Sequence, residues 1–334
     1  MSNQQTLFLG TKQGLRIGRF DGETWEQDSH YLAEVSVTGI IANDEKILLG
    51  TTNGIYQSGI GDSWTPSEDR LTIKRIRSLA RHPQDKNFVV AGTEPASVFL
   101  SHNFGRTWKE CTQVADIRDE CGWFLPYSPR AGCIRGFAFQ NDHIYAAAEE
   151  GGLLYSKNKG ADWQLVPGSS GEPDTSKIEK NGIHPDVHYV YAHPHDKSTI
   201  LAATGGGLYR TADRGATWDN IYHCYCRALW IDPDRPEHII FGPARGVDRD
   251  GRIMASFDAG KNWKELDSEL SQPFPRTMVE YFASTMSMLF CVLSDGTVLY
   301  SQRDSILWKT FRGSDNVQTL AIEEPGHLGT FERD

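Results

Sequence analysis

Short stretches in which apolar residues predominate or alternate with polar ones follow one another along the 334-residue chain, separated by turns rich in glycine, proline, asparagine and aspartate. A period of two is typical of strands that bury one face. Residues 199–204 (TILAAT) and 207–210 (GLYR) are two such stretches, separated by a pair of glycines. Because four stretches recur in each repeat, the pattern predicts four-stranded blades and an all-β chain.

Tryptophan marks the repeat. Seven tryptophans lie 39 to 55 residues apart, and four of them end a shared phrase at residues 101–108 (SHNFGRTW), 156–163 (SKNKGADW), 211–218 (TADRGATW) and 256–263 (SFDAGKNW). The Asp or Asn side chain is expected to accept hydrogen bonds from backbone amides of the turn, and glycine to take a positive φ. The tryptophan would then pack between neighbouring blades.

The number of repeats predicts a seven-bladed β-propeller, a single domain spanning residues 1–334. Residues 317–325 read as an inner strand without partners, whereas residues 6–29 supply three strands without an inner one. We expect these two segments to pair and close the ring, which removes exposed sheet edges. The other blades are expected at residues 35–69, 76–113, 134–168, 187–222, 226–267 and 278–311.

The inner strands align on their apolar pattern, and one aligned position is mostly polar. It holds Thr38, Arg77, Arg135, His188, Arg227, Val279 and Gln318 in the seven blades, with Glu280 beside the valine. Because side chains alternate across a strand, this position should face the central channel. Converging arginines would attract a carboxylate, sulfate or phosphate group. Alternatively, acidic residues such as Glu280 and Asp186 neutralise the arginines and leave a polar plug.

Two long connections between blades should reach the same mouth of the channel. The first, residues 111–133, carries aromatic and basic side chains that would suit a lid over a ligand, namely Trp123, Phe124, Tyr127 and Arg130. The second, residues 168–186, leads to two histidines. The candidate acids and bases near this mouth are His184, His188, Glu94, Glu149 and Glu150.

No cofactor is predicted, but the residues leave one metal interpretation open. Imidazole and thiolate groups near the mouth would suit zinc or copper, although their spacing matches no standard ligand motif. The residues concerned are His184, His188, His223, Cys224 and Cys226.

Charge and composition narrow the partners. The formal net charge of −10 argues against binding to nucleic acid or to an anionic membrane. The chain has no stretch of 18 apolar residues and no visible signal peptide, and its six cysteines follow no disulfide-scaffold spacing. We therefore expect a cytoplasmic protein with reduced thiols.

The tryptophan phrase resembles the Asp-box, or bacterial neuraminidase, repeat, and the resemblance covers nearly the whole chain. Sialidases, xyloglucan-active glycosidases, sorting receptors and photosystem assembly factors share this repeat, so it does not select a function. The chain lacks the Arg-Ile-Pro motif of sialidases and the second propeller of xyloglucan-active enzymes. Residues 92–95 (GTEP), 149–152 (EEGG) and 184–188 (HPDVH) make it most similar to single-propeller, glycosidase-like bacterial proteins, mostly without assigned activity.

Two functional hypotheses follow. In the first, the chain is a hydrolase or lyase acting on a small anionic molecule. The arginines, with Gln318 and Glu94, would bind this ligand, and His188 would move protons with help from His184, Glu149 or Glu150. In the second, it is a non-catalytic scaffold that docks a protein partner on the loop face through Trp123, Phe124 and Tyr127.

Overall fold

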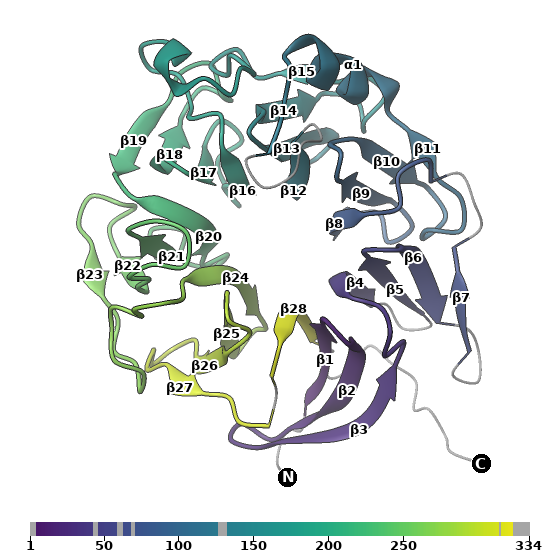
Figure 1. Cartoon of the computed structure of the whole chain (residues 1–334). Coiled ribbons are helices and arrows are strands. Elements are labelled where there is room, and N and C mark those ends of the chain that lie inside the picture. Colours follow the sequence, from purple (N-terminus) through teal and green to yellow (C-terminus); the bar gives the residue numbers. More distant parts are fainter. Residues whose placement is uncertain are drawn as a thin grey trace.

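The computed structural model describes residues 5–42, 46–58, 63–67, 71–125, 132–313 and 315–322. Their strands form seven four-stranded antiparallel sheets, arranged as blades around a central axis (Figure 1). The predicted all-β, seven-bladed propeller is therefore confirmed.

Six blades each use four consecutive strands. Blade one holds β4 (Val37–Ala42), β5 (Ile47–Thr51), β6 (Gly54–Ser58) and β7 (Trp64–Pro66), and blade two holds β8 (Ile76–Arg81), β9 (Val89–Thr93), β10 (Val98–Ser101) and β11 (Lys109–Glu110). Blade three holds β12 (Cys133–Gln140), β13 (His143–Glu149), β14 (Gly152–Ser156) and β15 (Gln164–Leu165), and blade four holds β16 (Val187–Ala192), β17 (Ile200–Thr204), β18 (Gly207–Thr211) and β19 (Asp219–Tyr222). Blade five holds β20 (Tyr225–Ile231), β21 (Ile239–Ala244), β22 (Met254–Ser256) and β23 (Lys264–Glu265), and blade six holds β24 (Val279–Ser284), β25 (Met288–Leu293), β26 (Val298–Gln302) and β27 (Lys309–Thr310).

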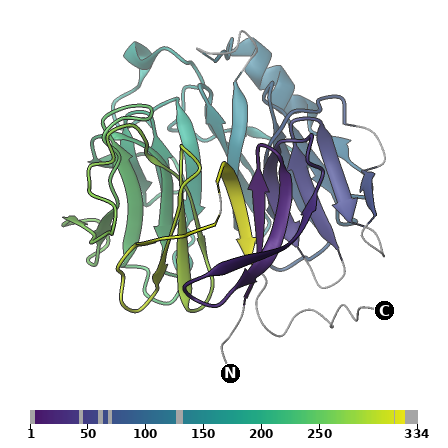
Figure 2. The same ribbon diagram turned by 60° about the horizontal axis from the view of Figure 1, so that its bottom comes forward.

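The seventh blade closes the ring with both ends of the described chain. Strand β28 (Val317–Ile322) pairs antiparallel with β1 (Gln5–Thr11), and β2 (Gly14–Phe20) and β3 (Trp25–Tyr31) complete the sheet. In Figure 2 the yellow strand β28 lies beside the purple strand β1. This is the closure that the sequence predicts.

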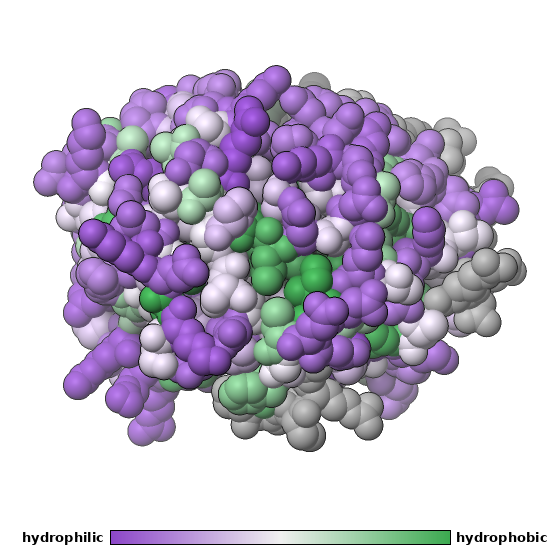
Figure 3. Space-filling model, turned by 90° about the horizontal axis from the view of Figure 1, so that it is seen from above, coloured by the Kyte–Doolittle hydropathy of each residue, from purple (hydrophilic) through white to green (hydrophobic). Residues whose placement is uncertain are grey.

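Burial is greater in the second strands than in the inner strands such as β8, and it falls again toward the rim. The second strands are short apolar runs, and β9 and β17 are buried along their whole length because each blade is covered by its neighbours on both faces. Outer strands such as β23 are only two residues long and exposed. The rim seen in Figure 3 is accordingly mostly hydrophilic, with a small group of apolar residues near its centre.

The repeated turn between the third and fourth strands has the predicted internal bonds. In blade four, Asp213 Oδ1 accepts hydrogen bonds from the Thr217 amide at 2.9 Å and the Thr211 hydroxyl at 2.7 Å. Gly215 has a φ of +91°. The indole of Trp218 is buried and donates to the Gly215 carbonyl oxygen at 3.2 Å. The turn therefore fixes the end of each blade.

Two connections contain helical structure that the sequence pattern did not predict. Helix α1 (Thr112–Glu120) lies between blades two and three, and the 3-10 helix η1 (Thr175–Lys177) lies between blades three and four. Neither helix is long or apolar enough to cross a bilayer, nor is any other helix in the described ranges.

Candidate functional site

A β-bulge in every inner strand turns one side chain toward the axis. The register between the first and second strand of each blade shifts at the same place, and in blade five the shift also includes Ala228. A bulge leaves a residue outside the hydrogen-bonded ladder and changes the direction of its side chain. The bulged residues, which we call the axial ring, are Thr38, Arg77, Arg135, His188, Arg227, Glu280 and Gln318.

Blade six corrects one predicted member of this ring. The apolar alignment selected Val279, but Val279 is fully buried, at the closest approach of blade six to Gly242 of blade five. Glu280 is the bulged residue, and its carboxylate reaches Arg135 on the far side of the ring at 3.2 Å. The alignment was wrong by one residue because two apolar residues in a row, Met278 and Val279, precede Glu280 and allow two alignments.

Each arginine of the axial ring faces a carboxylate. The ion pairs are Arg77 with Glu94 at 3.6 Å, Arg135 with Glu149 at 3.1 Å and with Glu280 at 3.2 Å, and Arg227 with Glu280. The arginines lie on the axial ring as predicted, but the uncompensated positive charge that the anion hypothesis required is absent from the described residues. Their pairing matches the neutralised alternative instead.

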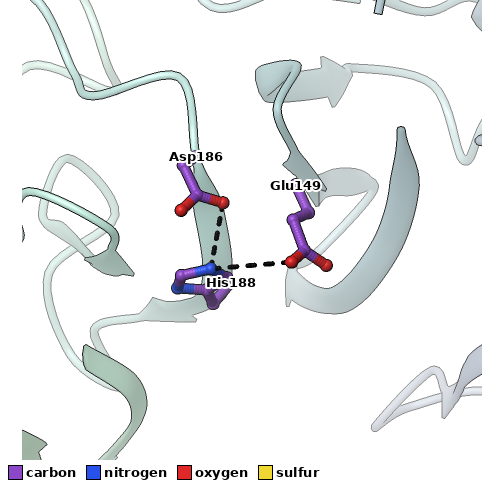
Figure 4. A group of neighbouring side chains, drawn as sticks. All are labelled: Glu149, Asp186 and His188. Carbon is purple, nitrogen blue, oxygen red and sulfur yellow. Dashed lines mark ion pairs between the residues drawn. The ribbon is translucent and has the colours of Figure 1, made fainter. Parts of the chain in front are cut away.

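His188 lies at the centre of an acidic group built by blades three and four (Figure 4). Its side chain is fully buried, and its Nε2 atom lies 2.9 Å from Asp186 Oδ1 and 4.0 Å from Glu149 Oε1. Its Nδ1 atom lies 2.9 Å from the carbonyl oxygen of Cys226. Glu149 ends β13, and Asp186 directly precedes β16. With the adjacent Glu150, these residues form what we call the axial acid cluster.

The two carboxyl groups that face His188 are held ionised. Burial raises the pKa of Glu149, but Arg135 and His188 outweigh that effect and hold the pKa well below its usual value. Burial likewise opposes ionisation of Asp186, but the neighbouring His188 outweighs it and the pKa is lowered overall. The Cys133 thiol also donates to Glu149 Oε2 at 3.1 Å.

Glu150 has the opposite environment. It occupies the turn between β13 and β14 with a φ of +59°, and the two following glycine amides donate to the Pro185 carbonyl oxygen at 3.0 and 2.6 Å. Burial, followed by the charges of Asp186 and Glu149, raises the pKa of Glu150 to about 7. The adjacent carboxyl groups of Glu149 and Glu150 therefore have pKa values shifted in opposite directions.

Tyr225 links the histidine to the arginines. Its hydroxyl accepts a hydrogen bond from Arg227 Nε at 3.0 Å and lies 3.3 Å from His188 Nε2. Burial raises the pKa of this hydroxyl, so it stays protonated. Tyr225 was not selected from the sequence, and Asp186 was considered only as a neutralising charge. The segment at residues 184–188 was the available signal for Asp186.

Several other predicted site residues lie outside this cluster. Gln318 donates to the Ser36 hydroxyl at 2.9 Å, and Glu94 is buried between Arg77 and Arg75. His184 accepts a hydrogen bond from the Asp186 amide at 3.2 Å, and burial lowers its pKa. It therefore orients Asp186 through the backbone.

Trp123, which was predicted to form part of a lid over the ligand, is buried in the structure. Trp123 is only 3% exposed and donates its indole N–H to the Gly171 carbonyl oxygen at 2.7 Å. It packs so closely on Gly151 that an added Cβ there would lie 2.6 Å from its ring. Phe124 is exposed, whereas Tyr127 and Arg130 lie outside the described residues. Trp123 is thus a packing residue, which also removes it from the proposed docking surface.

The five residues considered for zinc or copper do not assemble. The Cys226 thiol of blade five is buried and donates to the carbonyl oxygen of Gly207 in blade four at 3.4 Å. His223 Nδ1 lies 3.1 Å from the Asn220 side-chain nitrogen. Among the described residues, the group with converging ligand atoms is instead Glu149, Asp186 and His188, whose atoms all lie within 4.8 Å of one another.

Comparisons with known proteins give two kinds of similarity. The chain is 23% identical to a probable oligoxyloglucan-reducing end-specific xyloglucanase of Neosartorya fischeri, over 78% of this chain and 39% of that protein. It is 24% identical to the oligoxyloglucan-reducing end-specific xyloglucanase of Emericella nidulans, over 55% of this chain and 24% of that protein. The chain thus spans well under half the length of these relatives. No protein-family model matches it.

Solved structures share the fold at lower identity. An ancestral GH74 enzyme superposes with a TM-score of 0.58 at 15% identity, over 86% of this chain and 38% of that one. YCF48 bound to D1 peptide superposes with a TM-score of 0.59 at 13% identity, over 87% of each chain. These matches establish the propeller alone.

Proposed function

We propose that this chain is a glycosidase-like hydrolase whose active site is the axial acid cluster. The observation that carries the proposal is the gathering of three carboxyl groups and a histidine at one end of the axis, where the β13–β14 turn meets the start of β16. The sequence similarity to xyloglucanases supports the same class of reaction.

Hydrolysis of a glycosidic bond needs a carboxyl group that protonates the leaving oxygen and a second group that activates water. Glu149 is committed to Arg135, whereas no ion pair joins Glu150 to a basic side chain within the described ranges. We assign proton donation to Glu150 for this reason. The Glu149–Asp186–His188 group, whose polar atoms converge, is assigned to water activation.

The charge balance favours a neutral substrate. Two guanidinium groups, Arg135 and Arg227, stand against three carboxylates, those of Glu149, Asp186 and Glu280, and Glu150 becomes a fourth once it has given up its proton. An anionic ligand would meet this excess of negative charge, whereas sugar hydroxyls would donate hydrogen bonds to it. The proposed substrate is therefore a neutral oligosaccharide, and the arginines hold the carboxylates in position.

The test is hydrolysis of aryl glycosides and xyloglucan oligosaccharides by the purified chain and two variants. Glu150→Gln should lower kcat by roughly 10²- to 10⁴-fold, the usual contribution of general acid–base catalysis. The matched control is Glu172→Gln, which changes an exposed glutamate paired with Lys177 on the connection between blades three and four. Absence of hydrolysis across the panel, or full activity of Glu150→Gln, would reject the proposal.

A further inference from the structure

We propose that Glu149, Asp186 and His188 bind a divalent first-row transition-metal ion, for which Mn²⁺ and Zn²⁺ are the probes. The inference goes beyond the hydrolase assignment, because ion binding does not depend on which bond, if any, the site cleaves. It stands on the tautomer of one histidine, on one unsatisfied carboxylate oxygen, and on the distances among three ligand atoms.

The hydrogen bonding of His188 leaves Nε2 available as a ligand. Its Nδ1 atom lies 2.9 Å from the Cys226 carbonyl oxygen, a group that can only accept, so the ring carries a proton on Nδ1. In the neutral ring the lone pair is then on Nε2, which faces both carboxylates. A backbone carbonyl that holds the far ring nitrogen is the usual support of a metal-bound histidine.

Asp186 supplies the unsatisfied oxygen. Its Oδ1 atom is buried and forms no well-directed hydrogen bond with any described residue, although it lies 2.9 Å from His188 Nε2. A buried carboxylate oxygen without a donor is costly. A neutral histidine would also place two acceptor atoms against each other, so a positive centre between them is required.

Two of the distances among the three ligand atoms are compatible with one ion, and all three atoms lie within 4.8 Å of one another. Two ligands at about 2.1 Å from a metal, at about 90° to each other, lie about 3.0 Å apart. In that geometry, the direction from His188 Nε2 to Asp186 Oδ1 makes an angle of about 45° with the Nε2 lone pair, which points at the metal. This accounts for a short contact between the two atoms that is not a directed hydrogen bond. At the same bond length, the 4.0 Å separation of Nε2 from Glu149 Oε1 corresponds to an angle of about 145°.

The type of ligand selects the type of ion. Carboxylate oxygens favour Mg²⁺, Ca²⁺ and Mn²⁺, whereas imidazole favours Zn²⁺ and later transition metals. One imidazole with two carboxylates lies between these preferences, which points to Mn²⁺ or Zn²⁺ with water in the remaining positions. The excess of carboxylates over guanidinium groups around the axis supplies the compensating negative charge.

The competing explanation is a proton in place of the ion. A doubly protonated His188 would form an ion pair with Asp186, and the site would then have no need of a metal. Calorimetric titration of the full chain, dialysed first against EDTA, separates the two. We expect one saturable site for MnCl₂ or ZnCl₂ with micromolar affinity, and weaker binding of MgCl₂.

Variants locate the site. Glu149→Gln and Asp186→Asn keep the side-chain shape and should each weaken ion binding at least tenfold, with circular dichroism unchanged from the wild type. His223→Asn is the matched control, because His223 lies in the connection between blades four and five and contacts Asn220 rather than the cluster. It should leave the affinity unchanged.

The proposal is overturned if neither ion shows saturable binding below about 1 mM, or if the double variant Glu149→Gln/Asp186→Asn binds like the wild type. A double variant that fails to fold leaves the wild-type titration and the metal content of the purified wild type as decisive measurements. Hydrolysis of a glycoside by a chain that shows no saturable ion binding rejects the ion and keeps the hydrolase. Saturable ion binding without hydrolysis of any glycoside keeps the ion and rejects the hydrolase.

Discussion

Glu280 ties blade six to blades three and five across the axis, and its replacement by glutamine should destabilise the ring. Its carboxylate pairs with Arg135 at 3.2 Å and with Arg227. After Glu280→Gln, Arg135 keeps Glu149, whereas Arg227 keeps only the Tyr225 hydroxyl among the described partners. The substitution therefore leaves one guanidinium group without a carboxylate in a region that excludes most water.

The size of the effect follows from burial. Removing one partner of a buried ion pair costs about 3–5 kcal/mol. The Arg227 and Glu280 side chains remain 13% and 19% exposed, and glutamine keeps one acceptor oxygen, so we expect a loss of about 2–3 kcal/mol in the free energy of unfolding. Urea denaturation followed by tryptophan fluorescence measures this loss.

A matched control separates burial from charge. Glu265→Gln breaks a similar ion pair with Arg252 in blade five, where both side chains are about 40% exposed. That variant should lose no more than about 0.5–1 kcal/mol. The double variant Arg227→Met/Glu280→Leu should regain most of the lost stability, because a buried ion pair can often be replaced by apolar groups. Equal effects of Glu280→Gln and Glu265→Gln would refute the reasoning.

Three further outcomes are expected. Burial raises the pKa of Asp232, but hydrogen bonds from Arg303 and from backbone amides outweigh burial and lower the pKa overall. The ionised carboxylate therefore stabilises the folded state, and this stabilisation is lost as pH falls below about 4. In Asp232→Asn, the free energy of unfolding should change less with pH between about pH 5 and 3. Trp123→Ala should cost about 3–5 kcal/mol, measured by urea denaturation, because a buried indole is removed. Gly242→Ala should cost at least about 1–3 kcal/mol in the same assay, because the new Cβ would lie 2.3 Å from a side chain of blade six. Gly246→Ala, which meets nothing within 4 Å, should have little effect. A low-pH profile of Asp232→Asn as steep as the wild type, or similar stabilities for the two glycine variants, would contradict these predictions.

The blades were predictable because their signals are local. Short apolar strands and a turn phrase ending in tryptophan repeat within each blade, and every such unit forms the same four-stranded sheet. Ring closure followed from counting, since residues 317–325 lacked partners that residues 6–29 could supply. Most of the axial ring was also predicted, because six of its seven residues obey the apolar pattern.

The remaining features depend on contacts that are distant in sequence or on local irregularities. Arg135 and Glu280 are separated by 145 residues, so no spacing along the chain showed that the arginines are paired. In blade six, the consecutive apolar residues Met278 and Val279 allowed two alignments, and the one chosen missed Glu280 by one residue. Trp123 resembled a surface aromatic because it lies in a polar connection, and its burial depends on the approach of Gly151 and Gly171.

The pairing of β28 with β1 also constrains the order of events during synthesis. Of the 28 strands that the structure describes, the ribosome makes the inner strand of the seventh blade last. Until then, β1 exposes an unpaired backbone edge next to the axis. Strand β28 therefore closes the ring, and a chain shortened before Val317 should associate with other molecules through the unpaired edge of β1.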